Sequence, residues 1–169
     1  MDGIGERLVS LNDLQIKNNP SLESIAALRG VETVVGYIDI WNNASLRSLE
    51  GLEDLSSALF YLHIWDNPRL RDLSALRNLR VMSGNLSIRG NDELMILDGL
   101  NRAIEIGGSL TISDNSGLEE IVGFSLLESV GDTLTITDNR ALCESVTEEF
   151  MRRVDVRGEV VVEGNRPGC

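Results

Sequence analysis

Two short segments hold every tryptophan and tyrosine of the chain and its only histidine. In both segments these side chains, together with one aspartate, alternate with aliphatic ones. The alternating residues are Tyr37, Asp39, Trp41, Tyr61, His63 and Trp65. Side chains that alternate in this way lie on one face of a β-strand. The spacing therefore predicts two neighbouring strands whose outer faces together form one aromatic surface, with Tyr37 stacked on Tyr61 and Trp41 on Trp65.

This aromatic surface has four candidate roles. Exposed aromatic clusters are typical of binding sites, so the first role is recognition of a protein or of a carbohydrate, whose rings suit flat aromatic pairs. The second is burial through self-association or under a further segment. The third is stabilisation of the sheet by cross-strand pairs. The fourth is catalysis, with His63 as a general base beside Asp39.

Recognition is the role that the sequence favours. Lys17 and Arg89 hold equivalent positions on the strands to either side and give the aromatic surface a charged rim. Catalysis would need an activated nucleophile or paired carboxylates in an enclosed pocket. No serine or cysteine falls at an obvious activated position, so we expect no enzymatic activity, no catalytic residue and no cofactor. Two thiols and one distant histidine make too few ligands for a metal, so we expect none. The alternative function is a structural spacer or adhesion scaffold of a cell-surface protein.

A repeat of 24 residues positions these side chains. Asparagine recurs at this interval, and once after 26 residues, at Asn19, Asn43, Asn67, Asn91, Asn115, Asn139 and Asn165. Aliphatic residues stand three and five positions before each asparagine, and leucine stands three positions after the first six. A fixed period in this range is the signature of a repeat protein built from stacked units.

One repeat predicts a short strand with one buried face, followed by a turn at the asparagine. Gly36, Gly84 and Gly108 stand just before strands, where we expect glycine to let the chain turn. Stacked repeats would pair their strands in parallel and join their asparagines in an internal ladder. The sequence therefore predicts an all-β fold, a parallel β-helix (β-solenoid) of about seven coils. A leucine-rich horseshoe with α-helices is the competing architecture.

Residues 1–169 form a single domain in this interpretation, with a covering segment at each end. Residues 1–13 predict a partial N-terminal cap that would bury Ile4, Leu8 and Leu11. Residues 143–169 predict a C-terminal cap, because a stacked-repeat protein must cover its exposed end.

The C-terminal cap contains a predicted helix near 147–154. Acidic residues at its start and arginines at its end suit the helix dipole, and Ser145 or Thr147 is expected to cap it. Phe150, Met151 and Val154 would then be buried.

The two cysteines occupy the same position of the repeat. Cys143 follows Asn139 by four residues, and Cys169 follows Asn165 by four. In stacked repeats, equivalent positions lie about one strand spacing apart, within reach of a disulfide. We therefore predict a Cys143–Cys169 bond and an oxidising compartment.

Charge and hydropathy exclude other classes of partner. The net charge of −12 argues against nucleic acid, which calls for basic patches. No apolar run approaches the ~18 residues of a membrane span. The first residues lack the layout of a secretion signal, and we expect such a signal to have been removed.

The repeat resembles that of the receptor L-domain family, the domains of insulin and epidermal growth factor receptors. The resemblance lies in the hydrophobic spacing, the Asn-x-x-Leu turn and the glycine before the strand, in LHIWDNPRLRDLSALRNLRVMSGNLSIRGNDELMILDGL. The closing segments LCESVTEEFMRRV and VVVEGNRPGC look closer to bacterial secreted members. The resemblance implies a right-handed β-helix, an extracellular or cell-surface location, and ligand binding on the broad face of the sheet.

Overall fold

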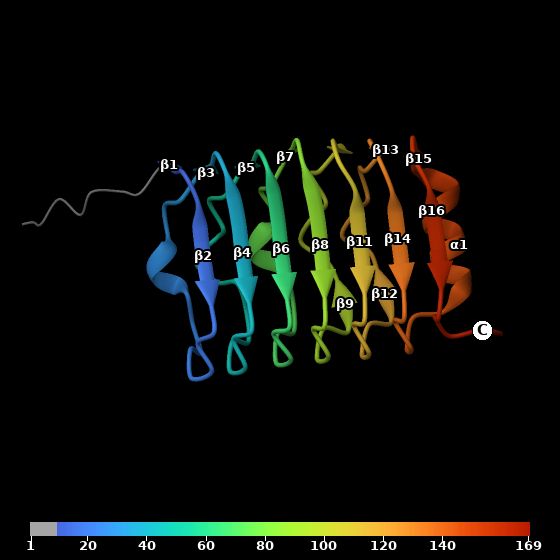
Figure 1. Ribbon diagram of the computed structural model, residues 1–169, viewed down its shortest axis with the longest axis horizontal. Helices are drawn as coiled ribbons and strands as arrows, with labels where there is room; N and C mark the ends of the chain where they lie inside the picture. The colour runs from blue at the N-terminus through green and yellow to red at the C-terminus, as the bar shows by residue number, and fades with distance from the viewer. Residues whose placement is uncertain (1–9) are drawn as a thin grey trace, which may run out of the picture.

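The structure, a computed structural model, describes residues 10–169. Its regular elements are mostly β-strands in parallel sheets, with a single α-helix in the described part (Figure 1). The expected all-β fold with parallel sheets is confirmed. Helices of the competing horseshoe are not found between the strands of residues 10–142, where the only helical elements are two 3-10 turns, η1 (Ala26–Leu28) and η2 (Ser74–Leu76).

Each repeat contributes one strand to each of two seven-stranded sheets. The first sheet contains the short strands β1 (Ser10–Leu11), β3 (Thr33–Val34), β5 (Ser57–Ala58), β7 (Val81–Met82), β10 (Glu105–Ile106), β13 (Ser129–Val130) and β15 (Asp155–Val156). The second contains β2 (Leu14–Lys17), β4 (Tyr37–Trp41), β6 (Tyr61–Trp65), β8 (Asn85–Arg89), β11 (Leu110–Ser113), β14 (Leu134–Thr137) and β16 (Val160–Glu163). In Figure 1 the strands of the second sheet lie side by side in chain order. A third sheet pairs β9 (Ile96–Leu97) with β12 (Glu120–Ile121).

The strands pair in the register that the repeat predicts. Tyr37 is aligned with Tyr61, and Trp41 with Trp65. The aliphatic residues between them point into the core, where Ile38, Ile40 and Ile64 are fully buried. Because side chains alternate along a strand, burial of the aliphatic set fixes the aromatic set on the outside.

The asparagine ladder runs through the interior. The backbone N–H and side-chain Nδ2 of Asn67 both donate to Oδ1 of Asn91, at 3.2 and 3.4 Å. The Nδ2 of Asn91 donates in turn to the carbonyls of Ile64 and Arg89, at 2.9 and 3.0 Å. The same bonds recur from repeat to repeat, and each asparagine from Asn43 to Asn139 is fully buried. Every ladder amide is thus satisfied by its neighbours, as buried polar groups require.

The turns that carry the ladder are left-handed at the residue before each asparagine. Asn42 and Asp66 have φ values of 56° and 51°, and Gly90 has 65°. Asparagine, aspartate and glycine tolerate this conformation, which explains why one of these three residues precedes each ladder asparagine. Gly36, Gly84 and Gly108 lie in bends just before strands, as expected, but they do not have positive φ. Close packing requires glycine instead: a Cβ on Gly84 would lie 1.3 Å from the carbonyl oxygen of Phe60.

The helix of the last repeat, α1 (Glu144–Arg153), lies at the C-terminal end of the sheets (Figure 1). It begins three residues before the predicted boundary, and Ser145 and Thr147 lie within it. The correct N-cap is Cys143, whose carbonyl oxygen accepts the N–H of Val146. The expected burial of Phe150 is confirmed, since its ring packs edge-on against Phe124.

At the opposite end, Ile4 and Leu8 of the predicted N-terminal cap lie outside the described residues. Leu11 belongs to β1, which extends the first sheet beyond β3 and packs against the core. Within the described residues, neither the helix nor the 3-10 turns have the length and apolar character needed to cross a lipid bilayer.

The predicted disulfide is confirmed between Cys143 and Cys169, with Cα atoms 5.8 Å apart. The disulfide joins the start of α1 to the end of the chain. Beside it, the backbones of Cys143 and Arg166 form an isolated parallel β-bridge. The last strand, β16, is therefore held both by pairing with β14 and by a covalent link.

We predict that Asn91→Ala lowers the free energy of unfolding by about 3 kcal/mol, because it leaves buried N–H and carbonyl groups of two repeats without partners. Urea unfolding followed by circular dichroism measures the change. Asn19→Ala is the matched control, since Asn19 lies exposed at the start of the ladder and its loss should cost less than about 1 kcal/mol. Equal costs for the two variants would show that the buried ladder is not a major source of stability.

Replacing both Cys143 and Cys169 with serine should destabilise the chain by about 2–4 kcal/mol, because the bond restricts the unfolded chain over a separation of 26 residues. Chemical unfolding with and without a reductant tests this. The reduced wild type should match the double variant, whereas a wild type that is indifferent to reductant would contradict the prediction.

Candidate functional site

The aromatic surface, comprising Tyr37, Trp41, Tyr61, His63 and Trp65, lies on the outer faces of β4 and β6. These strands stand in the second sheet between β2 and β8, so paired strands hold them on both sides. All five side chains are partly exposed. Strand pairing on both sides and the core beneath therefore fix the backbone of β4 and β6, so the aromatic surface is preorganised.

Four of the rings form one continuous stack. The ring of Tyr37 lies 5.2 Å from that of Tyr61 with an angle of 11° between their planes. Tyr61 stacks on His63 at 4.2 Å, and His63 stacks on Trp65 at 4.1 Å. Tyr61 and His63, the two inner rings, therefore have a neighbouring ring over each face, and this mutual cover contributes to their partial burial.

The expected stacking of Tyr37 on Tyr61 is confirmed, but that of Trp41 on Trp65 is wrong. The two tryptophans are aligned in register. Trp65, however, stacks on His63 of its own strand and donates its indole N–H to Oγ of Ser87 at 2.8 Å. This hydrogen bond holds Trp65 in the stack, and no ring contact joins Trp41 to it within the described residues.

His63 and Asp39 lie close together, as the register predicts. Nδ1 of His63 is 3.2 Å from Oδ1 of Asp39, and both side chains are less than one-fifth exposed. Burial lowers the pKa of His63 below its ordinary value, and the charge and hydrogen bond of Asp39 oppose this change only in part. The imidazole is therefore neutral at neutral pH, which suits its place between two aromatic rings.

The tyrosines are held by neighbouring polar groups. The backbone N–H of Tyr37 donates to Oδ1 of Asp13 at 3.0 Å, and its hydroxyl accepts a hydrogen bond from Nε2 of Gln15 at 2.8 Å. The pKa of Tyr61 is raised, first by burial and then by the negative charge of Asp39. The phenol of Tyr61 therefore stays neutral, and both tyrosines are partly exposed at the surface.

The charged rim is present but is not uniform. Lys17 is aligned with Trp41 on β2, and Arg89 is aligned with Trp65 on β8. The guanidinium of Arg89 forms an ion pair with Asp114 at 3.2 Å, so that its charge is partly compensated. Lys17 forms no ion pair among the described residues.

The register also brings Asp39, His63 and Ser87 into one row across three strands. A nucleophile activated by histidine would need its hydroxyl to hydrogen-bond to the imidazole. Within the described residues no such bond joins Ser87 to His63, and the oxygen of Ser87 accepts the indole N–H of Trp65 instead. The row therefore fixes the aromatic stack and supplies no activated serine.

Ser87 and Gln15 were not among the residues expected at the site. Both stand on strands next to the aromatic pair and hold a ring through a hydrogen bond. Their place in the same row as Asp39 and His63 could have identified them, because register follows directly from the repeat.

The pKa of His63 should be measurable without ambiguity, because it is the only histidine of the chain. We predict a value below the ordinary 6.5, further lowered in Asp39→Asn, which removes the favourable charge, and raised in Trp65→Ala, which admits water. An NMR titration of the imidazole Cε1–H tests both signs. A wild-type value at or above 6.5 would contradict the assignment.

The same depressed pKa has a consequence for stability. As the pH falls, the unfolded chain binds the proton first, so the stability contributed by neutral His63 is present above about pH 6.5 and is lost as the pH falls through the folded-state pKa.

Comparison of the chain with protein-family models, with curated proteins and with solved structures found no match.

Proposed function

We propose that the chain is a non-catalytic recognition domain that binds a protein partner through the aromatic surface. The observation that carries this proposal is the aromatic surface on β4 and β6, which stays partly exposed although it holds all the tryptophan and tyrosine of the chain. Tryptophan and tyrosine are enriched among the few residues that dominate the binding energy at protein interfaces. A partner that covers these rings would gain their remaining apolar surface without having to order them.

The rest of the same sheet face differs from the aromatic surface. On β11 and β14 the outward residues are small and polar, namely Thr111, Ser113, Thr135 and Thr137. Threonine is a good strand former and is sufficient to maintain pairing. Because strands without aromatic residues pair in the same register, the aromatic stack is not needed to hold the sheet together, which supports a role in binding.

The orientation of the rings favours a protein over a carbohydrate. A sugar ring packs on the open face of an aromatic side chain, but neighbouring rings cover both faces of Tyr61 and His63. What they present are ring edges, hydroxyl groups and the nearby charges of Lys17 and Asp39. This mixture of apolar edges and polar groups resembles the core and rim of a protein interface.

A right-handed β-helix of the receptor L-domain type is part of the proposal. It is supported by the 24-residue register shared by both seven-stranded sheets and by the internal asparagine ladder. The sequence likeness implies ligand binding on the broad sheet face, where the aromatic surface lies. The disulfide supports an oxidising, extracellular location.

A structural spacer or adhesion scaffold is the second candidate. The evenly paired strands of the second sheet, with strands β11 and β14 offering only small polar side chains, favour it. A spacer would not need a partly exposed ring stack, and this separates the two candidates experimentally.

We predict that the double variant Trp41→Ala and Trp65→Ala loses at least about tenfold in affinity for its partner, because alanine removes two large anchors of the surface. Wild type and variant are immobilised and compared on a glycan array and in capture of secreted and cell-surface proteins. The partner selected by the wild type is then titrated by calorimetry. The proposal expects a protein that the variant fails to retain.

The matched control is Thr111→Ala with Thr135→Ala, two outward residues of the same sheet face that lie outside the aromatic surface. It should bind as the wild type does, and circular dichroism should show that all the variants are folded. Retention of the partner by the double tryptophan variant would refute the proposal. Selection of glycans alone, or a concentration-dependent dimer abolished by the tryptophan changes, would replace the protein partner with a sugar or a second copy of the chain.

A further inference from the structure

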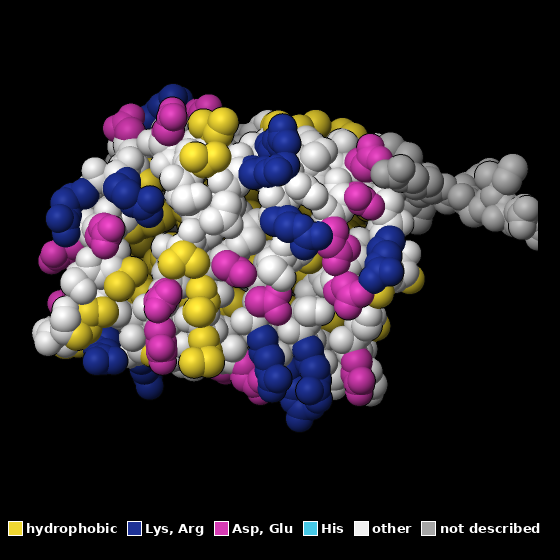
Figure 2. Space-filling view, turned by 180° about the vertical axis from the view of Figure 1, so that it is seen from behind, with side chains coloured by type: hydrophobic (Ala, Val, Ile, Leu, Met, Phe, Trp, Pro, Cys, Tyr) yellow, Lys and Arg dark blue, Asp and Glu magenta, His cyan; other side chains and the backbone are white. Residues whose placement is uncertain are grey.

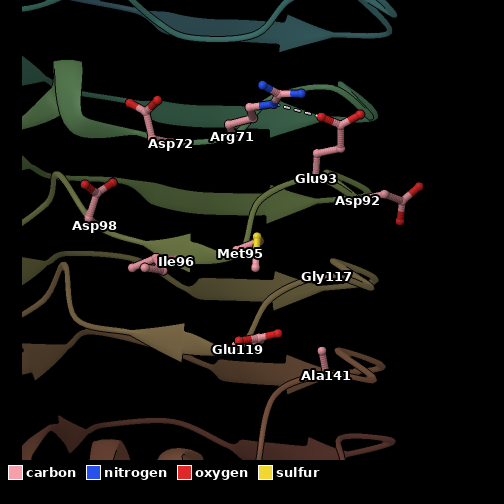
Figure 3. Close-up of a pocket in the computed structure, with 10 residues that line it drawn as sticks. All are labelled: Arg71, Asp72, Asp92, Glu93, Met95, Ile96, Asp98, Gly117, Glu119 and Ala141. Carbon is pink, nitrogen blue, oxygen red and sulfur yellow. Dashed lines mark hydrogen bonds and ion pairs between the residues drawn. The ribbon is translucent and has the colours of Figure 1, made fainter.

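A second surface lies on the wall formed by β9 and β12, away from the aromatic surface. It is a groove with an apolar floor and an acidic rim, lined by Arg71, Asp72, Asp92, Glu93, Met95, Ile96, Asp98, Gly117, Glu119 and Ala141. Figure 3 shows Met95 and Ile96 in the middle, with carboxylates on several sides. In Figure 2, which views the molecule from behind, hydrophobic side chains lie among acidic ones.

The floor departs from the repeat. Met95 and Ile96 are 54% and 43% exposed. The residues at the position of Met95 in the neighbouring repeats are Arg71 and Glu119, and those at the position of Ile96 are Asp72 and Glu120. Only Leu97, the next residue, is needed for the core, where it is fully buried. The two exposed apolar side chains therefore serve neither the core nor the pattern of the repeat.

Small residues keep this floor open. Gly117 and Ala141 line the groove at a position where the preceding repeat carries Glu93. A Cβ on Gly117 would lie 2.2 Å from the carbonyl oxygen of Asp92. The backbone of one repeat thus approaches the next closely at this point, and no long side chain from Gly117 or Ala141 covers Met95.

The rim is strongly acidic. Five of the ten lining residues are acidic and one is basic. Arg71 pairs with Glu93 at 2.9 Å, whereas the carboxylate of Glu119 has no hydrogen bond or ion pair among the described residues. No cluster of carboxylates in the described part of the chain could hold a metal ion. The uncompensated charge is therefore available to cationic groups placed around an apolar one.

We propose that this groove binds a protein segment in which apolar side chains are flanked by lysine or arginine. The apolar side chain would cover Met95 and Ile96, and the cationic groups would pair with Glu119 and Asp92. Burial supplies the affinity and charge complementarity supplies the orientation and the selectivity. This surface is distinct from the aromatic surface and does not depend on the function proposed for it.

A fluorescent synthetic peptide of alternating lysine and leucine is the probe, titrated by fluorescence anisotropy at low and high salt. We expect saturable binding that weakens as salt rises, because exposed charges are screened. Met95→Ser with Ile96→Ser should weaken it about tenfold, as should Asp92→Asn with Glu119→Gln. Peptides with serine in place of leucine, or glutamate in place of lysine, should bind at least about tenfold more weakly.

Matched controls separate the groove from general attraction to an acidic protein. Glu159→Gln with Glu163→Gln removes the same charge from exposed positions around β16, and Val81→Ser with Leu126→Ser removes exposed apolar residues elsewhere. Both controls, and the double tryptophan variant, should bind as the wild type does. The proposal would be overturned if the groove variants bound the peptide as well as the wild type does, or if the controls lost as much affinity as the groove variants. The absence of saturable binding at low salt would also overturn it. Thermal unfolding confirms that each variant is folded.

Discussion

The buried asparagine ladder is the interaction on which the rest of the structure depends. Each amide satisfies the backbone and side-chain groups of the repeats on either side, so a repeat that slipped by one residue would leave several buried polar groups unpaired. The ladder thus fixes the register of every strand in the second sheet. The left-handed turns and the aliphatic core require the same register, so turn chemistry, core packing and buried hydrogen bonding all specify one structure.

A fixed register turns sequence position into a position on the surface. Residues 24 apart become neighbours, and single substitutions in successive repeats add up to a patch. The aromatic surface arises in this way from two repeats, and the groove beside β9 and β12 from four. The protein therefore varies its surface chemistry without altering its interior, and the recognition site that we propose requires this separation.

Much of this organisation could be predicted from the sequence because the repeat is regular. The strands, the ladder and the disulfide follow from positions 24 or 26 residues apart. Side-chain rotation does not follow from register, which is why Trp65 stacks on His63 and not on Trp41. The start of α1 was also misplaced, because serine and threonine suggested caps where Cys143 ends the preceding turn.

The groove escaped prediction for a different reason. Met95 and Ile96 directly precede the core residue Leu97, so that an apolar run conceals two exposed side chains. The equivalent residues of the two neighbouring repeats are charged, and comparing Met95 and Ile96 with them would have identified the groove. Hydroxyl-radical footprinting of the chain with its captured partner shows which face of the chain the partner covers. Recognition by the aromatic surface predicts protection of the rings on β4 and β6; protection confined to other faces, with these rings still reactive, would contradict it.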